Sequence, residues 1–371
     1  MYRLIKGEGK PLFTFETTRG GRPLFDKHDL LVKFDKIVWK RTEPWPFEAV
    51  GIAQAIVISA MSTCLTRTRG LIGYSRSHKA VCMAYQGPAR GDNRCQEKGC
   101  LLCSNQSCPG LIPELLLAAN TRQIESLKEG IVFSTDVPTR KGFKPLWKAG
   151  VSDVIYLSSE QSETDDFEYI ARHRGANVQK FAQKMQNCSN PAFWVEKVKQ
   201  VREIIDSMEK PISFEEAGIL LAILNSGRVH CVKQKAGCVG FDYDGRLLGG
   251  SYNGPLPGDA HCDECGCEKD DGGFCIGGHA EQNLIDNIAD TKDLEGGTVF
   301  VTLFPCLECM TVLAHCRVRK IICYNEYIRE PSKKDASPSE WPAVKDLAEK
   351  TGVSIYHYTA DGLVLMTKSR E

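Results

Sequence analysis

The sequence lacks an excess of charge of either sign, a long apolar run and any strong compositional bias. Its 371 residues carry 47 Lys and Arg against 47 Asp and Glu, so no net positive field is available to hold a nucleic-acid backbone. The longest apolar run, Ala49 to Met61, is shorter than the roughly 18 residues that span a bilayer, and no signal-peptide core is evident. With 42% hydrophobic and 25% charged residues, fibrous and disordered classes are excluded. We expect a soluble cytoplasmic protein of about two domains.

Cysteine, by contrast, is abundant. The chain has 17 cysteines, and this odd number in a sequence without a secretion signal favours metal ligation and free thiols over a disulfide framework. The placement of the cysteines therefore becomes the main guide to function.

A tandem repeat organises the chain. A constant numbering offset of 167 pairs Cys64 with Cys231 and aligns "AYQGPARGD" with "SYNGPLPGD" and "GIVFSTDVP" with "GTVFVTLFP". No gap is needed between about Cys64 and Tyr156, and a ten-residue insertion near "REPSKKDASPS", predicted to be a surface loop, then changes the offset to 177. Such long gap-free agreement indicates a duplication.

Each copy alternates helix and strand patterns. Amphipathic helices are predicted at Phe47 to Ser62 and Phe214 to Leu224, each followed by a β-hairpin. In the second copy "HAEQNLIDNI" and "PCLECMTVLAHC" predict helices, and "GTVFVTLF" and "KIICY" predict strands. The fold class is therefore α/β, as two tandem α/β/α sandwiches.

Four parts are predicted along the chain. They are an N-terminal extension at residues 1–45 with the strand-like runs "LFTFE" and "LLVKFDKIVW", a first copy at 46–185, a helical linker at 186–210 and a second copy at 211–371. Within the linker, Pro191 to Met208 is predicted to be helical.

The second copy holds a constellation suited to catalysis. "HAE" begins at His279, and "PCLEC" supplies Cys306 and Cys309, so three zinc ligands leave a fourth tetrahedral position open. Zinc lowers the pKa of water from about 15.7 toward 7, and Glu281, two residues after the His, can move the proton. A closed zinc knuckle is the alternative, but it explains neither this carboxylate nor the proline before the first Cys. The pattern H-x-E followed by P-C-x-x-C is the signature of zinc-dependent nucleobase deaminases.

A second set of cysteines predicts up to two structural zinc ions. The offset of 167 relates three cysteines in each copy, and each copy adds a fourth of its own. The sets are Cys95, Cys100, Cys103 and Cys108 in the first copy, and Cys262, Cys265, Cys267 and Cys275 in the second. His261 is an alternative ligand, and buried reduced cysteines without metal are the alternative reading.

The first copy lacks the catalytic ligands. At the same offset His279 falls on Ile112, Cys306 on Thr139 and Cys309 on Gly142. Of the four catalytic positions, only that of Glu281 keeps its residue type, as Glu114. The first copy therefore lacks all three zinc ligands and is expected to be catalytically inert. It serves either as a structural partner or as a regulatory nucleotide pocket.

These motifs resemble the cytidine and deoxycytidylate deaminase superfamily, and within it dCMP deaminases. The resemblance rests on "GRLLGGSYNGPLPG", "HCDECGC", "CIGGHAEQNLI" and "VFVTLFPCLEC". It extends over roughly Glu215 to Tyr358. The sequence differs from the family pattern at Ser251, where the family has glycine. The resemblance implies hydrolytic deamination of dCMP to dUMP and ammonia, with a dCTP or dTTP effector and a homo-oligomer. The residues it implies for substrate are Asn253, Ala280 and Tyr327, and those for the effector are Tyr252 and Gly254. Asn253 is equally explained by turn chemistry.

Three alternatives remain at this point. The substrate could be dCTP, a modified deoxycytidine nucleotide or cytidine. The candidate phosphate-binding residues Arg317, Arg319, Lys320 and Arg329 do not decide between these substrates, because they are better explained as solvated surface residues. A polynucleotide cytosine deaminase fits the zinc motif but not the zero net charge. A non-enzymatic regulatory protein would not need the complete zinc and glutamate set. No membrane partner is expected.

Overall fold

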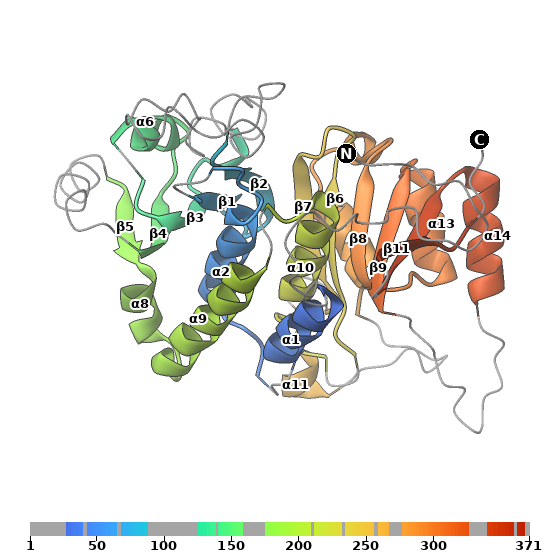
Figure 1. Cartoon of the computed structure of the whole chain (residues 1–371), viewed down its shortest axis with the longest axis horizontal. Coiled ribbons are helices and arrows are strands. Elements are labelled where there is room, and N and C mark those ends of the chain that lie inside the picture. Colours follow the sequence, from blue (N-terminus) through green and yellow to red (C-terminus); the bar gives the residue numbers. More distant parts are fainter. Residues whose placement is uncertain are drawn as a thin grey trace, which may run out of the picture. The chain divides into compact units, whose positions relative to one another are not determined.

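The computed structural model describes residues 27–39, 43–64, 68–87, 125–138, 140–158, 175–208, 211–231, 234–255, 259–266, 277–325, 340–359 and 362–367. The chain divides into two compact units (Figure 1). One is Trp45–Ala217, and the other combines Met1–Pro44 with Gly218–Glu371. Among the described residues, no helix is both long and apolar enough to cross a membrane.

The first unit is built on a five-stranded sheet with the order β2-β1-β3-β4-β5. Its strands are β1 (Gly70–Tyr74), β2 (Ala80–Tyr85), β3 (Ile131–Asp136), β4 (Asp153–Ser158) and β5 (Asn177–Lys180). Strand β1 is antiparallel to β2 and β3, whereas β3, β4 and β5 are parallel. The described helices are α2 (Phe47–Ser59), α6 (Arg140–Lys148), α8 (Phe181–Lys184), η1 (Met185–Asn187) and α9 (Pro191–Ser207).

The second unit is built on a six-stranded sheet with the order β11-β10-β9-β8-β6-β7. Its strands are β6 (Gly237–Phe241), β7 (Leu247–Tyr252), β8 (Thr298–Leu303), β9 (Lys320–Asn325), β10 (Ser354–Thr359) and β11 (Gly362–Leu365). The described helices are α1 (Lys27–Trp39), α11 (Cys262–Cys265), α12 (Ala280–Asn287), η2 (Thr291–Leu294), α13 (Leu307–His315) and α14 (Trp341–Thr351), together with α10 (Phe214–Ser226), which begins in the first unit.

The two sheets repeat each other in register. The offset of 167 carries both ends of β1, β2, β3 and β4 onto the ends of β6, β7, β8 and β9, and an offset of 177 carries the start of β5 onto that of β10. Antiparallel and parallel pairings recur in the same places, including the predicted hairpins. The structure therefore confirms the α/β class and agrees with the tandem repeat.

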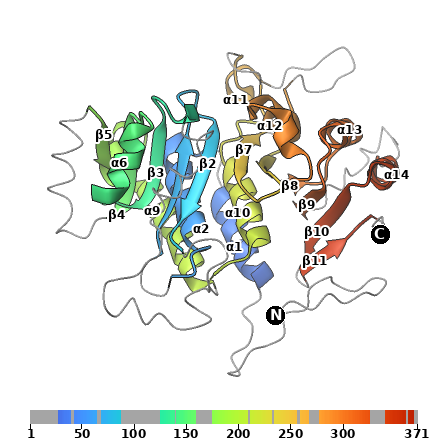
Figure 2. The ribbon, with the colours of Figure 1, turned by 90° about the horizontal axis from the view of Figure 1, so that it is seen from above.

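Helices cover both faces of the second sheet, which makes three layers (Figure 2). On one face α10 approaches so closely that a Cβ at Gly237 would lie 2.0 Å from the Ala222 carbonyl oxygen, which explains the glycine. On the other face α12, α13 and α14 pack against the strands through Leu284, Met310, Leu313 and Ala348. This second face carries the candidate site.

Two predictions about the N-terminal helices were wrong. The strand-like run at Leu30 to Trp39 forms α1, because its buried residues Leu31, Phe34 and Val38 recur with helical spacing. Helix α2 is not amphipathic, since every residue from Ala49 to Ser59 is buried. The reason is that α2 lies between the sheet and α9, so neither side of it faces solvent.

Candidate metal centre and active site

Two helix starts bring the predicted ligands together. His279 is the residue that precedes α12, and Cys306 precedes α13, just beyond the end of β8. Both have extended backbone conformations typical of N-caps, which direct their side chains toward the first turn of the helix. Cys309 lies one turn into α13 and is fully buried.

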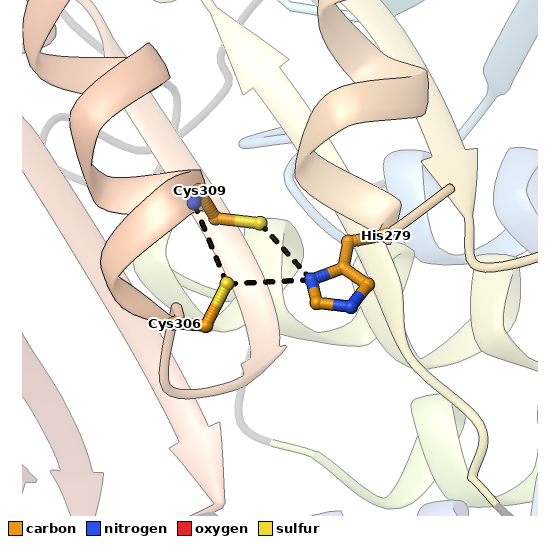
Figure 3. A group of neighbouring side chains, drawn as sticks. All are labelled: His279, Cys306 and Cys309. Atoms are coloured by element: carbon orange, nitrogen blue, oxygen red, sulfur yellow. Dashed lines mark hydrogen bonds between the residues drawn. The ribbon is translucent and has the colours of Figure 1, made fainter. Parts of the chain in front are cut away.

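The three ligand atoms converge (Figure 3). His279 Nδ1 lies 3.3 Å from Cys309 Sγ and 3.4 Å from Cys306 Sγ, and all three atoms lie within 4.8 Å of one another. Within the described part of the chain, these residues form the one group of three or more His, Cys, Asp or Glu side chains that could hold a metal ion. The predicted catalytic ligands are thus placed side by side.

The donor set fits zinc. One imidazole and two thiolates are borderline and soft ligands that zinc accepts in tetrahedral sites. With zinc bonds of about 2.0 to 2.3 Å, tetrahedral angles place N and S ligand atoms about 3.5 Å apart, close to the distances found here. Three protein ligands leave one position for a reactant, which is the arrangement of catalytic zinc sites.

Mutual hydrogen bonds set the charges of the two thiols. The hydrogen bond with Cys309, assisted by His279, lowers the pKa of Cys306 to about 4. The same hydrogen bond, together with burial and the carboxylate of Glu281, raises the pKa of Cys309. The hydrogen bond to Cys306 also raises the pKa of His279. Cys306 lies at the N-terminus of α13, where the helix dipole favours the negative charge of a thiolate ligand.

Glu281 is buried beside this group. It lies in the first turn of α12 and is only 8% exposed, and burial raises the pKa of its carboxyl group. It also interacts electrostatically with His279 and Cys309. A carboxyl group next to a metal position can accept a proton from one reacting group and donate it to another.

Ser251, which stands where the family pattern has glycine, makes a structural hydrogen bond. Its hydroxyl donates a 2.6 Å hydrogen bond to the carbonyl oxygen of Ala280, and both residues are buried. This bond ties β7 to the start of α12, where His279 and Glu281 are held.

A side-chain brace joins the two ligand-bearing helices, and sequence reasoning missed it. The Gln282 amide oxygen accepts a hydrogen bond from the backbone N–H of His279 at 3.0 Å. The Gln282 amide nitrogen donates to Glu308 Oε1 at 2.9 Å. Glu308 lies between the two cysteines, so its position inside "PCLEC" was the available signal.

The predicted substrate turn lies against α12. Asn283 Nδ2 donates to the carbonyl oxygen of Tyr252 at 2.8 Å. The Gly254 N–H donates at 3.1 Å to the carbonyl oxygen of Gly278, the residue directly before His279. The side chain of Asn253 accepts from Ala236 N–H at 2.7 Å and donates to the Gln234 carbonyl at 3.0 Å. These bonds tie the side chain of Asn253 to the segment that leads into β6.

The basic residues divide between opposite ends of the sheet. Lys320 begins β9, whereas Cys306 follows the end of the parallel strand β8, so Arg319 and Lys320 lie at the other end from the metal ligands. Arg317 forms an exposed ion pair with Glu295, and Arg329 lies outside the described residues. By contrast, Lys235 adjoins Ala236, the partner of Asn253, and Arg228 stacks 5.1 Å from the centre of the Tyr252 ring.

The structural zinc predictions concern residues that are mostly not described. Cys267, Cys275, the four cysteines of the first copy and Tyr327 lie outside the described residues. Of the described pair, Cys265 Sγ contacts backbone oxygens of Ala260, His261 and Gly266, and Cys262 is half-buried. The rings of His230 and His261 stack 3.9 Å apart beside Asp263.

The first copy has an ion pair at the strand ends that correspond to the metal-ligand end of the second sheet. Arg69 and Asp136, 3.9 Å apart, are related by the offset of 167 to Ala236 and Leu303. The repeat counterparts of the three metal ligands are Ile112, Thr139 and Gly142. Ile112 and Thr139 lie outside the described residues, as does Glu114, the counterpart of Glu281, whereas Gly142 lies in α6.

Comparison with known proteins bears on the second copy. Residues 214–325 match the family described as the cytidine and deoxycytidylate deaminase zinc-binding region. A deoxycytidylate deaminase of Mycobacterium phage D29 is 29% identical over 126 residues, which cover 31% of this chain and 96% of that protein. ComE operon protein 2 of Bacillus subtilis is 26% identical over 129 residues, covering 34% of this chain and 62% of that protein.

Other relatives match over differing shares of their length. The Saccharomyces cerevisiae deoxycytidylate deaminase is 24% identical over 137 residues, and the match spans 44% of it. Among solved structures, the dCMP deaminase of cyanophage S-TIM5 in complex with dCMP and dUMP is 25% identical, with a TM-score of 0.32, over 40% of this chain and 99% of that one. Residues 214–325 of the second copy, which include the candidate metal ligands, are thus similar to the zinc-binding region of cytidine and deoxycytidylate deaminases.

Proposed function

We propose that the second copy deaminates a deoxycytidine nucleotide, converting dCMP and water to dUMP and ammonia. The observation that carries the proposal is the convergence of His279, Cys306 and Cys309 within 4.8 Å, with buried Glu281 beside them. A metal site with three ligands and an adjacent carboxylate suits hydrolysis at an amidine carbon. The phage D29 relative, which matches over 96% of its length, supports dCMP as the substrate.

The chain's own residues would hold the metal and move protons. His279, Cys306 and Cys309 would bind one zinc ion, which would supply a water of lowered pKa as the nucleophile for C4 of cytosine. Glu281 would accept a proton from that water and deliver it to N3 of the base. It would then accept the proton of the new C4 hydroxyl group and deliver it to the departing amino group, so that the C4–N bond breaks, a C4 carbonyl forms and ammonia leaves. The raised pKa of Glu281 supports both proton transfers.

The phosphate would bind beside the Tyr252 to Gly254 turn. Lys235 and Arg228 are cations placed at that turn, since Lys235 adjoins the partner of Asn253 and Arg228 stacks on Tyr252. Tyr252 and Gly254 would then contact the nucleotide or a dCTP or dTTP effector, and Asn253 and Ala280 would border the sugar and base. Tyr327 is proposed as a further contact on the basis of the resemblance alone.

A substrate panel tests the proposal. Cytidine, dCMP, dCTP and a cytosine-containing oligonucleotide are each incubated with the zinc-loaded chain, with and without dCTP or dTTP as effector, and loss of cytosine absorbance is followed. The proposal predicts turnover of dCMP above the other three. Turnover of dCTP or the oligonucleotide alone would keep the chemistry and overturn the substrate, and a response to triphosphate would support the effector.

A further inference from the structure

The repeat includes a helix that precedes the paired helices α2 and α10 in each copy. Helices α1 and α9 are themselves related by the offset of 167, which places Lys27–Trp39 on residues 194–206, within Pro191–Ser207. Leu31, Phe34 and Val38 of α1 are 0%, 0% and 1% exposed. Their counterparts Val198, Val201 and Ile205 of α9 are 1%, 0% and 1% exposed. The same positions are thus buried in both helices, although few residues are identical.

The helix that leads the second copy packs in the first unit. Helix α9 precedes α10 in the sequence, but it lies along α2 (Figure 1). Its buried Trp194 places its ring 5.6 Å from the ring of Trp45, which leads into α2. The apolar stripe of α9 therefore covers the outer side of α2 and accounts for the complete burial of that helix.

The helix that leads the first copy packs in the second unit. Helix α1 precedes α2 in the sequence, but its Trp39 Nε1 donates a 2.5 Å hydrogen bond to Ser226 Oγ at the end of α10. Burial, and after it the charge of the Asp35 carboxylate of α1, raises the pKa of the Tyr324 phenol in β9. Helix α1 therefore covers the face of the second sheet opposite the metal ligands.

We infer that the two copies exchange their leading helices. The face formed by α10 and β9 is a docking surface, and its partner is the chain's own N-terminal helix α1, whereas α9 fills the matching surface on the inactive copy. Each unit is then completed by a helix that belongs in sequence to the other repeat. This gives the inactive copy a reason to persist. Without it, Trp194, Val198, Val201 and Ile205 of α9 would lose the surface that buries them.

Hydrogen exchange of the full-length chain tests the helix exchange without relying on activity. Two matched variants are compared, Phe34→Asp in α1 and Val201→Asp in α9, which occupy the same position of the repeat. The inference predicts that Phe34→Asp lowers amide protection in α10 by at least about tenfold while α2 keeps its protection. Val201→Asp should do the reverse. Lys33→Glu, at an exposed position of α1, should change neither.

The opposite result would overturn the inference. If each helix packs on its own copy, Phe34→Asp would lower protection in α2, and Val201→Asp would lower it in α10. Should either aspartate variant fail to accumulate, Phe34→Ala and Val201→Ala give the same comparison with milder losses. Equal loss of protection in both units from either variant would also contradict the helix exchange.

Discussion

At the residue scale, the metal ligands could be predicted from spacing, because each motif places its side chains within one or two turns of a helix start. The partners of those ligands could not be predicted in the same way. Gln282 meets Glu308, and Ser251 meets Ala280, across helices or between a strand and a helix, at separations that only the folded chain defines.

Removal of a metal ligand should remove the zinc. We expect Cys306→Ser to lower zinc content from about one ion per chain at this site and to reduce turnover by at least about a thousandfold, because the nucleophile depends on the metal. Metal analysis of the purified variant and its rate on dCMP check this. Cys316→Ser, a half-buried thiol at the end of α13, serves as the control. Full zinc content in Cys306→Ser would refute the assigned ligand.

The brace between Gln282 and Glu308 should matter for the position of the ligands. Gln282→Ala and Glu308→Ala are each expected to reduce turnover by about ten- to a hundredfold, the usual effect of losing an outer partner of a metal ligand. The double variant should lose little more than Gln282→Ala alone, because that single variant already removes the hydrogen bond between the two side chains. Asp346→Asn, which breaks an exposed ion pair on α14, is the control. Additive losses would show that the two residues act separately.

At the element scale, the sequence predicted most helices and strands but misjudged α1. The run "LLVKFDKIVW" is rich in β-branched and aromatic residues and suits a strand as well as a helix, and the sequence repeat is evident only in its best-matching segments. The pattern of buried positions shows that α1 and α9 are equivalent helices of the repeat, because the same positions are buried in both although the side chains differ. Helix α2 was misjudged for a related reason, because α9, which covers it, follows the whole first sheet in the chain.

The buried carboxyl of α1 should make stability depend on pH. Burial raises the pKa of Asp35 from 3.8 to about 7, and its Oδ1 has no hydrogen-bond partner among the described residues. Between these two values the unfolded chain releases the proton while the folded chain keeps it, so the free energy of unfolding falls as pH rises and levels off above about 7.

Asp35→Asn should remove this dependence. The variant is expected to be more stable than the parent at pH 8, by up to about 4 kcal/mol, and to differ little at pH 4. Thermal unfolding at both pH values measures the difference, with Asp346→Asn as an exposed control. A variant that is less stable than the parent at pH 8 would show that the charged carboxylate is stabilised by its surroundings.

At the scale of the whole molecule, the chain is a duplicated fold in which the second copy holds the candidate metal ligands. The sequence predicted this division, because the ligands occur in one copy and their counterparts in the other cannot bind zinc. It could not predict which helix completes which unit, since the helix exchange depends on packing and not on the order of elements along the chain.

Zinc removal should act on the second copy. A chelator is expected to abolish turnover and to lower the unfolding temperature of the second unit, because bound metal stabilises the folded state that holds it. Zinc addition should restore both, and magnesium should not, since thiolate ligands select softer ions. Calorimetry with and without the chelator follows the change. An unchanged rate after complete zinc removal would exclude zinc catalysis.

The central claim is tested most directly by measuring dCMP deamination and zinc content in the same samples of the parent chain and Glu281→Ala. Because Glu281 would move protons and would not bind the metal, the variant should keep its zinc and lose turnover by at least about a hundredfold. Turnover retained by Glu281→Ala, or no turnover of dCMP by a parent chain that holds zinc at His279, Cys306 and Cys309, would contradict the account.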